Sequence, residues 1–263
     1  MAIGMEGAPG HQAGAINRDG SLDTAGARGS YRLHPTMGGF DQMTARLGGF
    51  WDSMLGEGRR WWITSTSDSH LHWRDGGADF WPGEYSKTYV HAARTYDDIL
   101  DGIRSGRVFV TTGDLISELQ VTAETVGPRQ ARATIGGNLP VPAGRDVRVK
   151  IRLRDPQAPN HHGDTPRVAR VDLIVGEITG PVADRMRDTN PTTRVVVRFD
   201  EGSWTRDGEW LTMNHTFRAV RRASYLRVRG TNTGELEPSP DPLGEDPWSD
   251  LWFYTNPIFL EVR

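Results

Sequence analysis

An alternating run, Val147-Arg148-Val149-Lys150-Ile151-Arg152-Leu153, sets the architecture of the second half of the chain. Aliphatic residues alternate with arginine or lysine along the whole run. Because successive side chains of a strand point to opposite faces, one face must lie on a core while the other carries positive charge into water. This pattern is typical of an antiparallel sheet with one solvated face.

Other short strands are expected on both sides of this run. They are rich in β-branched and aromatic residues, and clusters of Gly, Pro and Asp separate them. They cover residues 118–123, 168–175, 194–199, 215–220, 225–229 and 258–262. The sequence therefore predicts an all-β antiparallel sandwich over residues 116–263.

The first part of the chain has a mixed pattern. Apolar residues recur at helical spacing from Phe40 to Leu55 and are interrupted by Gly48-Gly49, which predicts two short helices or one bent helix. A strand at 61–64, a helix capped by Thr95 and ended by Gly106, and a strand at 107–112 follow. Strand, helix and strand in this order favour an α/β unit, so we expect an α/β domain over residues 1–115.

Composition excludes several classes of protein. The chain has 263 residues, a formal net charge of -3 and no cysteine. A nucleic-acid partner is not expected because no basic excess would neutralise phosphates. No apolar stretch is long enough for a membrane span and residues 1–10 do not resemble a signal peptide, so we expect a soluble chain with no membrane partner, in an undetermined compartment. Without cysteine, any metal ligands are His, Asp and Glu.

The sharpest candidate motif is Ser67-Asp68-Ser69-His70, which follows the strand predicted at 61–64. Residues two apart at a strand end point to the same side, so Asp68 and His70 could reach one cation. The plainer interpretation is a turn with an unrelated surface histidine, and for so short a pattern it is the more frequent one. Glu6 and His11, in a glycine-rich segment, and His34, before a proline, offer further ligands.

Taken in order, these motifs resemble the C-terminal part of the PHP (polymerase and histidinol phosphatase) superfamily, especially its CehA/McbA-like branch. The matching elements are a G-x-E element at Glu6, the pair His34-Pro35, a W-D-x-x-L-x-E-G-R helix at 51–59, and S-D-x-H at 67–70. The resemblance implies that residues 1–115 form part of a distorted β/α barrel. That barrel would carry two or three divalent metal ions, whether zinc, manganese or iron.

The resemblance also implies roles for individual residues. Asp68 and His70 would be metal ligands, Glu6 a bridging carboxylate, and His11 and His34 further ligands. A metal-activated water would attack a small phosphoester or a carboxyl or carbamate ester. Arg59 and Lys87 are candidates to stabilise the developing negative charge, although such residues more often solvate a surface. Tyr85 and Tyr89 are weaker candidates of the same kind.

One departure from the superfamily pattern leaves a second function open. The superfamily begins with an H-x-H pair, and none precedes Glu6. We therefore expect the N-terminal half of the barrel to be missing, and an incomplete barrel to be a poor enzyme or to self-associate through exposed edges. The alternative is a barrel remnant that acts as a binding or scaffolding protein through its β-sandwich.

Overall fold

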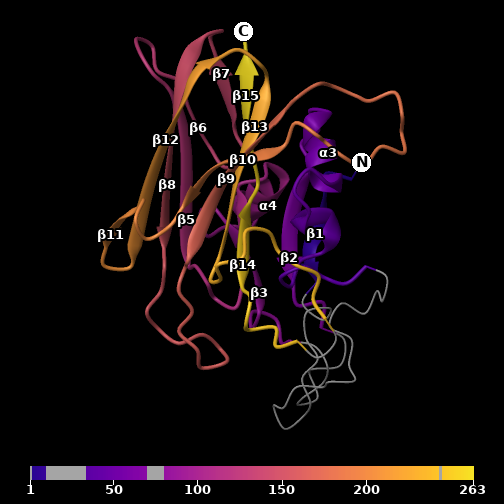
Figure 1. Cartoon of the computed structure of the whole chain (residues 1–263), viewed down its shortest axis with the longest axis vertical. Helices are drawn as coiled ribbons and strands as arrows, with labels where there is room; N and C mark the ends of the chain where they lie inside the picture. The colour runs from indigo at the N-terminus through magenta and orange to yellow at the C-terminus, as the bar shows by residue number, and fades with distance from the viewer. Residues whose placement is uncertain (1, 10–33, 70–79, 243–244) are drawn as a thin grey trace.

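Two large sheets with a shared core form most of the computed structural model, which describes residues 2–9, 34–69, 80–242 and 245–263 (Figure 1). The smaller sheet has five antiparallel strands in the order β11 (Thr205–Asp207), β12 (Trp210–Val220), β8 (Arg145–Arg154), β5 (Glu118–Thr125) and β6 (Arg132–Thr134). The larger has eight strands. Six run in the order β10 (Arg194–Phe199), β9 (Arg170–Glu177), β13 (Ser224–Thr231), β14 (Trp252–Thr255), β4 (Val108–Thr112) and β3 (Ser86–Val90), while β15 (Ile258–Val262) pairs with β13 and with β7 (Asn138–Val141).

Strand β8 has the alternation that its sequence predicts. Its aliphatic residues from Val147 to Leu153 are buried between the sheets, whereas Arg148 and Lys150 are exposed. The core that they enter also contains Leu173 of β9 and Val228 of β13, from the opposite sheet. Period-two burial of this kind fixes the register of the strand, because a shift of one residue would place the cations in the core.

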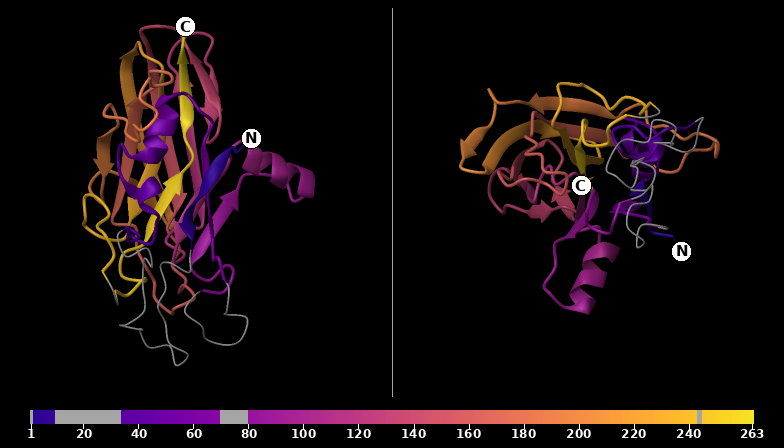
Figure 2. Two further views of the ribbon diagram at one scale, coloured as in Figure 1. Left: turned by 90° about the vertical axis from the view of Figure 1, so that its right-hand side faces the viewer. Right: turned by 90° about the horizontal axis from the view of Figure 1, so that it is seen from below.

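A third, smaller layer lies beside the large sheet. It contains the parallel pair β1 (Gly4–Pro9) and β2 (Trp62–Thr66), together with α2 (Gln42–Ala45) and α3 (Phe50–Gly56). A second apolar core, which includes Trp51, Ile63 and Tyr254, joins this layer to the sheet. Helix α4 (Tyr96–Arg104) stands away from the rest of the molecule (Figure 2).

The buried ion pair between Asp52 and Arg227 fastens α3 to the large sheet. Arg227 of β13 donates from Nε and Nη2 to the two carboxylate oxygens of Asp52, at 2.9 and 2.7 Å, and both side chains are fully buried. Burial is the largest single effect on Arg227 and lowers its pKa, but the charge and hydrogen bonds of the Asp52 carboxylate, together with the nearby tyrosines, raise the pKa overall. The Asp of the W-D-x-x-L-x-E-G-R motif therefore has a structural role, because it holds α3 against the large sheet.

The prediction of a β/α barrel in the first part of the chain is wrong. Of the described residues, 42% lie in strands and 9% in three helices, and these strands form no closed barrel. The predicted strand, helix and strand exist as β2, α4 and β4, but β3, which was not predicted, lies between β2 and α4, and β4 does not join β2 in a parallel sheet. Instead β4 pairs antiparallel with β3 and β14, and its five residues are all buried. Local pattern identifies a strand without specifying its neighbours.

Candidate functional site

The pairing of strands β1 and β2 places Glu6, a predicted metal ligand, beside the end of β2 that precedes Asp68, another predicted ligand. The two strands pair in parallel, with Glu6 opposite Thr64 and Pro9 opposite Thr66. The register shifts between Glu6 and Ala8, and the Thr66 hydroxyl donates a hydrogen bond to Oε1 of Glu6. The Glu6 carboxylate is therefore held at Thr66, the last residue of β2, and Asp68 follows Thr66 by two positions in the sequence.

Asp68 has an unusual backbone conformation. Its φ of 46° lies in the left-handed region, which few non-glycine residues adopt, and aspartate is one of those that tolerate it. Ser67, immediately before it, is buried. Residues held in this region cluster at functional sites, because the surrounding structure must compensate for the strain.

The remaining predicted ligands are less informative. His11 and His70 lie outside the described residues. His34 is exposed, two residues before Thr36, whose carbonyl accepts a hydrogen bond from the backbone N–H of Asp241 at 2.8 Å.

The two predicted charge-stabilising residues lie in different places. Arg59 precedes β2, at the end of that strand opposite to Asp68, and its Nε donates to Glu57 at 2.6 Å. This bond, more than any other contact, lowers the pKa of Glu57. Lys87 lies on β3, which is joined to β2 by hydrogen bonds between Thr88 and the backbone of Ser65. Lys87 is ion-paired with Asp114.

The two tyrosines proposed with them take part in packing. Tyr85 is fully buried and donates its hydroxyl to the carbonyl of Pro247 at 3.0 Å. Tyr89 stacks on Phe109 with ring centroids 4.6 Å apart, and burial is the main cause that raises its pKa. Neither observation gives them a part in chemistry.

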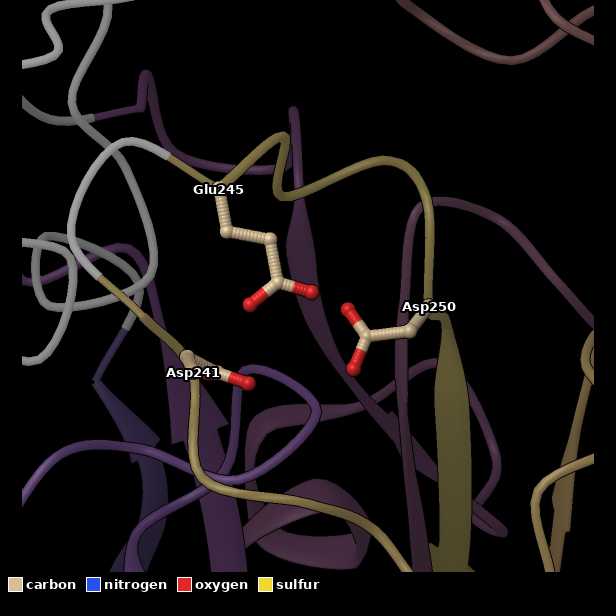
Figure 3. A group of neighbouring side chains, drawn as sticks. All are labelled: Asp241, Glu245 and Asp250. Carbon is tan, nitrogen blue, oxygen red and sulfur yellow. The ribbon is translucent and has the colours of Figure 1, made fainter.

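Three acidic residues that were not predicted as ligands lie together before β14. Figure 3 shows the carboxylates of Asp241, Glu245 and Asp250 converging, and one oxygen of each lies within 4.8 Å of the others. Three carboxylates suit hard cations such as calcium or magnesium. The signal in the sequence was weak, because acids spaced four and five residues apart in a proline-rich loop are common.

Asp241 also has a structural task. Its two carboxylate oxygens accept hydrogen bonds from the backbone N–H groups of Gly38 and Gly39, at 2.8 and 3.0 Å. Both glycines have positive φ, and a Cβ on Gly38 would lie 2.3 Å from the Trp252 ring. This contact joins the acidic loop to residues 36–41, where Asp41 donates its backbone N–H to Gly7 of β1.

Within the part of the chain that the structure describes, the acidic group is the one set of three ligand atoms this close together. Glu6, Asp68 and His34 do not form such a set among these residues, and both members of the pair that would complete it, His11 and His70, lie outside them. In the same described residues no helix has the length and apolar character of a membrane span.

Comparisons with protein-family models, with curated proteins and with solved structures find no match to this chain. The candidate site is therefore judged on its own residues and geometry.

Proposed function

We propose that this chain contributes carboxylate and imidazole ligands to the divalent-metal site of a hydrolase that acts on phosphoesters or on carboxyl or carbamate esters. The observation that supports this most is the parallel pairing of β1 with β2, with the Glu6 carboxylate held by Thr66 two residues from Asp68. The proposed relationship to the PHP superfamily rests on the sequence motifs alone, because the strands of the described residues form no closed barrel.

The donor set suits the proposed metal. Glu6 and Asp68 would supply oxygen ligands and His70 a nitrogen ligand, with His11 and His34 as further candidates, and this mixture accepts zinc, manganese or iron. A bound ion of this kind supplies an activated water at neutral pH and polarises the ester. The Thr66 hydroxyl fixes one oxygen of Glu6 and leaves the other for a ligand.

The proposal assigns different weight to the two basic candidates. Lys87 lies on the strand next to β2, but Asp114 already compensates its charge, so we give it at most a role in positioning. Arg59 is left out, because it pairs with Glu57 at the other end of β2.

The first test is metal content, measured by mass spectrometry on purified protein equilibrated with zinc or manganese. The comparison sets the wild type beside Glu6→Gln with Asp68→Asn, and beside Glu245→Gln with Asp250→Asn as the matched control. We expect the first pair to lose bound metal and the control to keep it. Loss in the control alone would move the site to the acidic group, and a wild type without metal would refute the proposal.

The second test is hydrolysis of bis(p-nitrophenyl) phosphate and p-nitrophenyl acetate. We expect metal-dependent turnover that falls at least about tenfold in Glu6→Gln with Asp68→Asn, because ligand loss weakens both metal affinity and activity. Circular dichroism would establish that the variant is folded. Turnover unchanged by chelation or by these substitutions would contradict the reaction class.

One observation favours the alternative of a binding protein. The outer face of the five-stranded sheet has a hollow of about 370 Å³ lined by Thr122, Glu124, Arg132, Arg148, Lys150 and Asn214. Arg148 pairs with Glu124, whereas no ion pair to Lys150 occurs among the described residues. A folded protein that holds no metal and hydrolyses neither ester would favour recognition of an anionic ligand on this face.

A further inference from the structure

Helix α4 presents its apolar side to solvent. Tyr96, Ile99 and Leu100 are 89, 39 and 46% exposed, a set of large apolar groups that a monomer normally buries. Figure 2 shows the helix projecting from the sheets. Only its last turn is held: Gly102 lies against Val90, and the carbonyl of Arg104 accepts a hydrogen bond from the Trp62 indole at 2.9 Å.

The exposed helix is nevertheless well formed. The Thr95 hydroxyl accepts from the backbone N–H of Asp98 at 3.2 Å and donates to its carboxylate at 2.7 Å, which caps the N-terminus. Asp97 lies in the first turn and Arg104 in the last, so both charges complement the helix dipole. An ordered helix with an apolar side in solvent indicates a docking surface.

A hollow beside α4 extends this surface. It has a volume of about 280 Å³ and is lined by β1, β2 and the helix. Its apolar walls are Ile3, Met5, Trp62 and Ile103, and its polar lining includes Glu6 and Thr64. Ile3 is 44% exposed. Among the described residues β1 pairs only with β2, so its outer edge adds backbone groups able to accept a partner.

The charges on α4 indicate which partner this surface fits. Asp97, Leu100 and Arg104 are spaced i, i+3 and i+7, so they share one face of the helix. If two such helices pack antiparallel about a two-fold axis, each Asp97 meets Arg104 of the second copy, and the two Leu100 side chains meet near the axis. The helix is thus complementary in charge to itself.

We propose that two copies of this chain associate through α4, with their helices antiparallel. Tyr96 of each copy then approaches Ile103 and the hollow beside it on the other. A nine-residue helix is only about 13 Å long, so the interface is small and the dimer weak and dependent on concentration. The proposal does not depend on bound metal, although Glu6 of the proposed metal site also lines this hollow.

Sedimentation velocity over a wide range of protein concentration tests this. We expect a reversible monomer–dimer equilibrium that Leu100→Lys weakens at least about tenfold, because it places a cation in the apolar contact. Met186→Lys is the matched control: Met186 is 88% exposed, and the next residue, Arg187, accepts a hydrogen bond from Ser53 of α3, so the substitution is expected to leave association unchanged.

A charge reversal tests the antiparallel arrangement itself. Asp97→Lys and Arg104→Glu, each alone, place like charges opposite one another and are expected to weaken association, whereas the double variant restores opposite charges and is expected to recover it. Circular dichroism would distinguish weakening by charge repulsion from weakening by loss of the helix. A wild type that stays monomeric, equal weakening by the Met186 control, or no recovery in the double variant would overturn the proposal.

Discussion

Replacing Asp52 by alanine is expected to destabilise the protein strongly. Its carboxylate accepts hydrogen bonds from Arg227 at 2.9 and 2.7 Å, from the Tyr225 hydroxyl at 3.0 Å and from the backbone of Gly48 at 2.8 Å, and it is fully buried. Asp52→Ala leaves the Arg227 guanidinium without a counterion in the second core. Breaking such a pair from one side costs about 3–5 kcal/mol.

This magnitude is large relative to the whole stability of a domain, about 5–15 kcal/mol. At a midpoint shift of about 2–4 °C per kcal/mol for a chain of this size, Asp52→Ala should lower Tm by roughly 6–20 °C. Urea unfolding followed by tryptophan fluorescence would report it directly, since Trp51 lies under Arg227, whose guanidinium carbon is 4.7 Å from the ring centroid.

A double variant separates the buried charge from a general packing defect. Asp52→Leu with Arg227→Met removes both charges and keeps apolar volume, so it should recover at least about 2 kcal/mol relative to Asp52→Ala. Recovery will be incomplete, because the backbone N–H of Gly48 also loses its acceptor. A loss below about 1 kcal/mol in Asp52→Ala would refute the reasoning, since it would mean that Arg227 does not need this partner.

Two further predictions concern stability. The buried Tyr254 hydroxyl has no hydrogen-bond partner among the described residues, and burial raises its pKa. Above about pH 10 the unfolded chain loses this proton while the folded protein keeps it. The free energy of unfolding therefore falls as pH rises beyond that point. Tyr254→Phe should be neutral or stabilising at pH 7 and reduce this alkaline loss in chemical unfolding, and an unchanged pH dependence would contradict it. Gly106→Ala should lower Tm, because Gly106 has a φ of +68° and a Cβ there would lie 2.4 Å from the Trp62 ring. Gly83→Ala is the control: Gly83 also has a positive φ, but a Cβ there would meet nothing within 4 Å, so this variant measures the backbone cost without the steric clash.

Much of the secondary structure was predictable because local signals determine it. The predicted strands at 194–199 and 258–262 match β10 and β15, and the break at Gly48-Gly49 separates α2 from α3. The prediction of a barrel was wrong because it assumed the wrong pairing between strands. Strands β3 and β14, which flank β4, were not predicted: β3 has no regular alternation, and β14, within Trp252–Thr255, is buried at every residue and so has no period-two pattern.

The candidate site was predictable only as motifs. Glu6 and Asp68 are 62 residues apart in sequence, and the placement of Glu6 beside the end of β2 depends on the parallel pairing of β1 with β2, which no local pattern specifies. The acidic group depends in the same way on the contact between Asp241 and the glycines at 38 and 39. Composition within a loop cannot reveal such a contact, because the two partners lie 203 and 202 residues away in the sequence.

The W-D-x-x-L-x-E-G-R motif is long, but it supports the resemblance to metallohydrolases only weakly. Its Trp51 stacks on Arg227, its Asp52 neutralises Arg227, and its Glu57 pairs with Arg59, so packing alone accounts for each of these side chains. A motif that the fold already requires says little about catalysis. The case for a metal therefore depends on Glu6, whose carboxylate Thr66 holds at the end of β2, and on Asp68, which follows Thr66 by two residues and has a left-handed backbone. For this reason the paired substitution of these two residues is the decisive experiment.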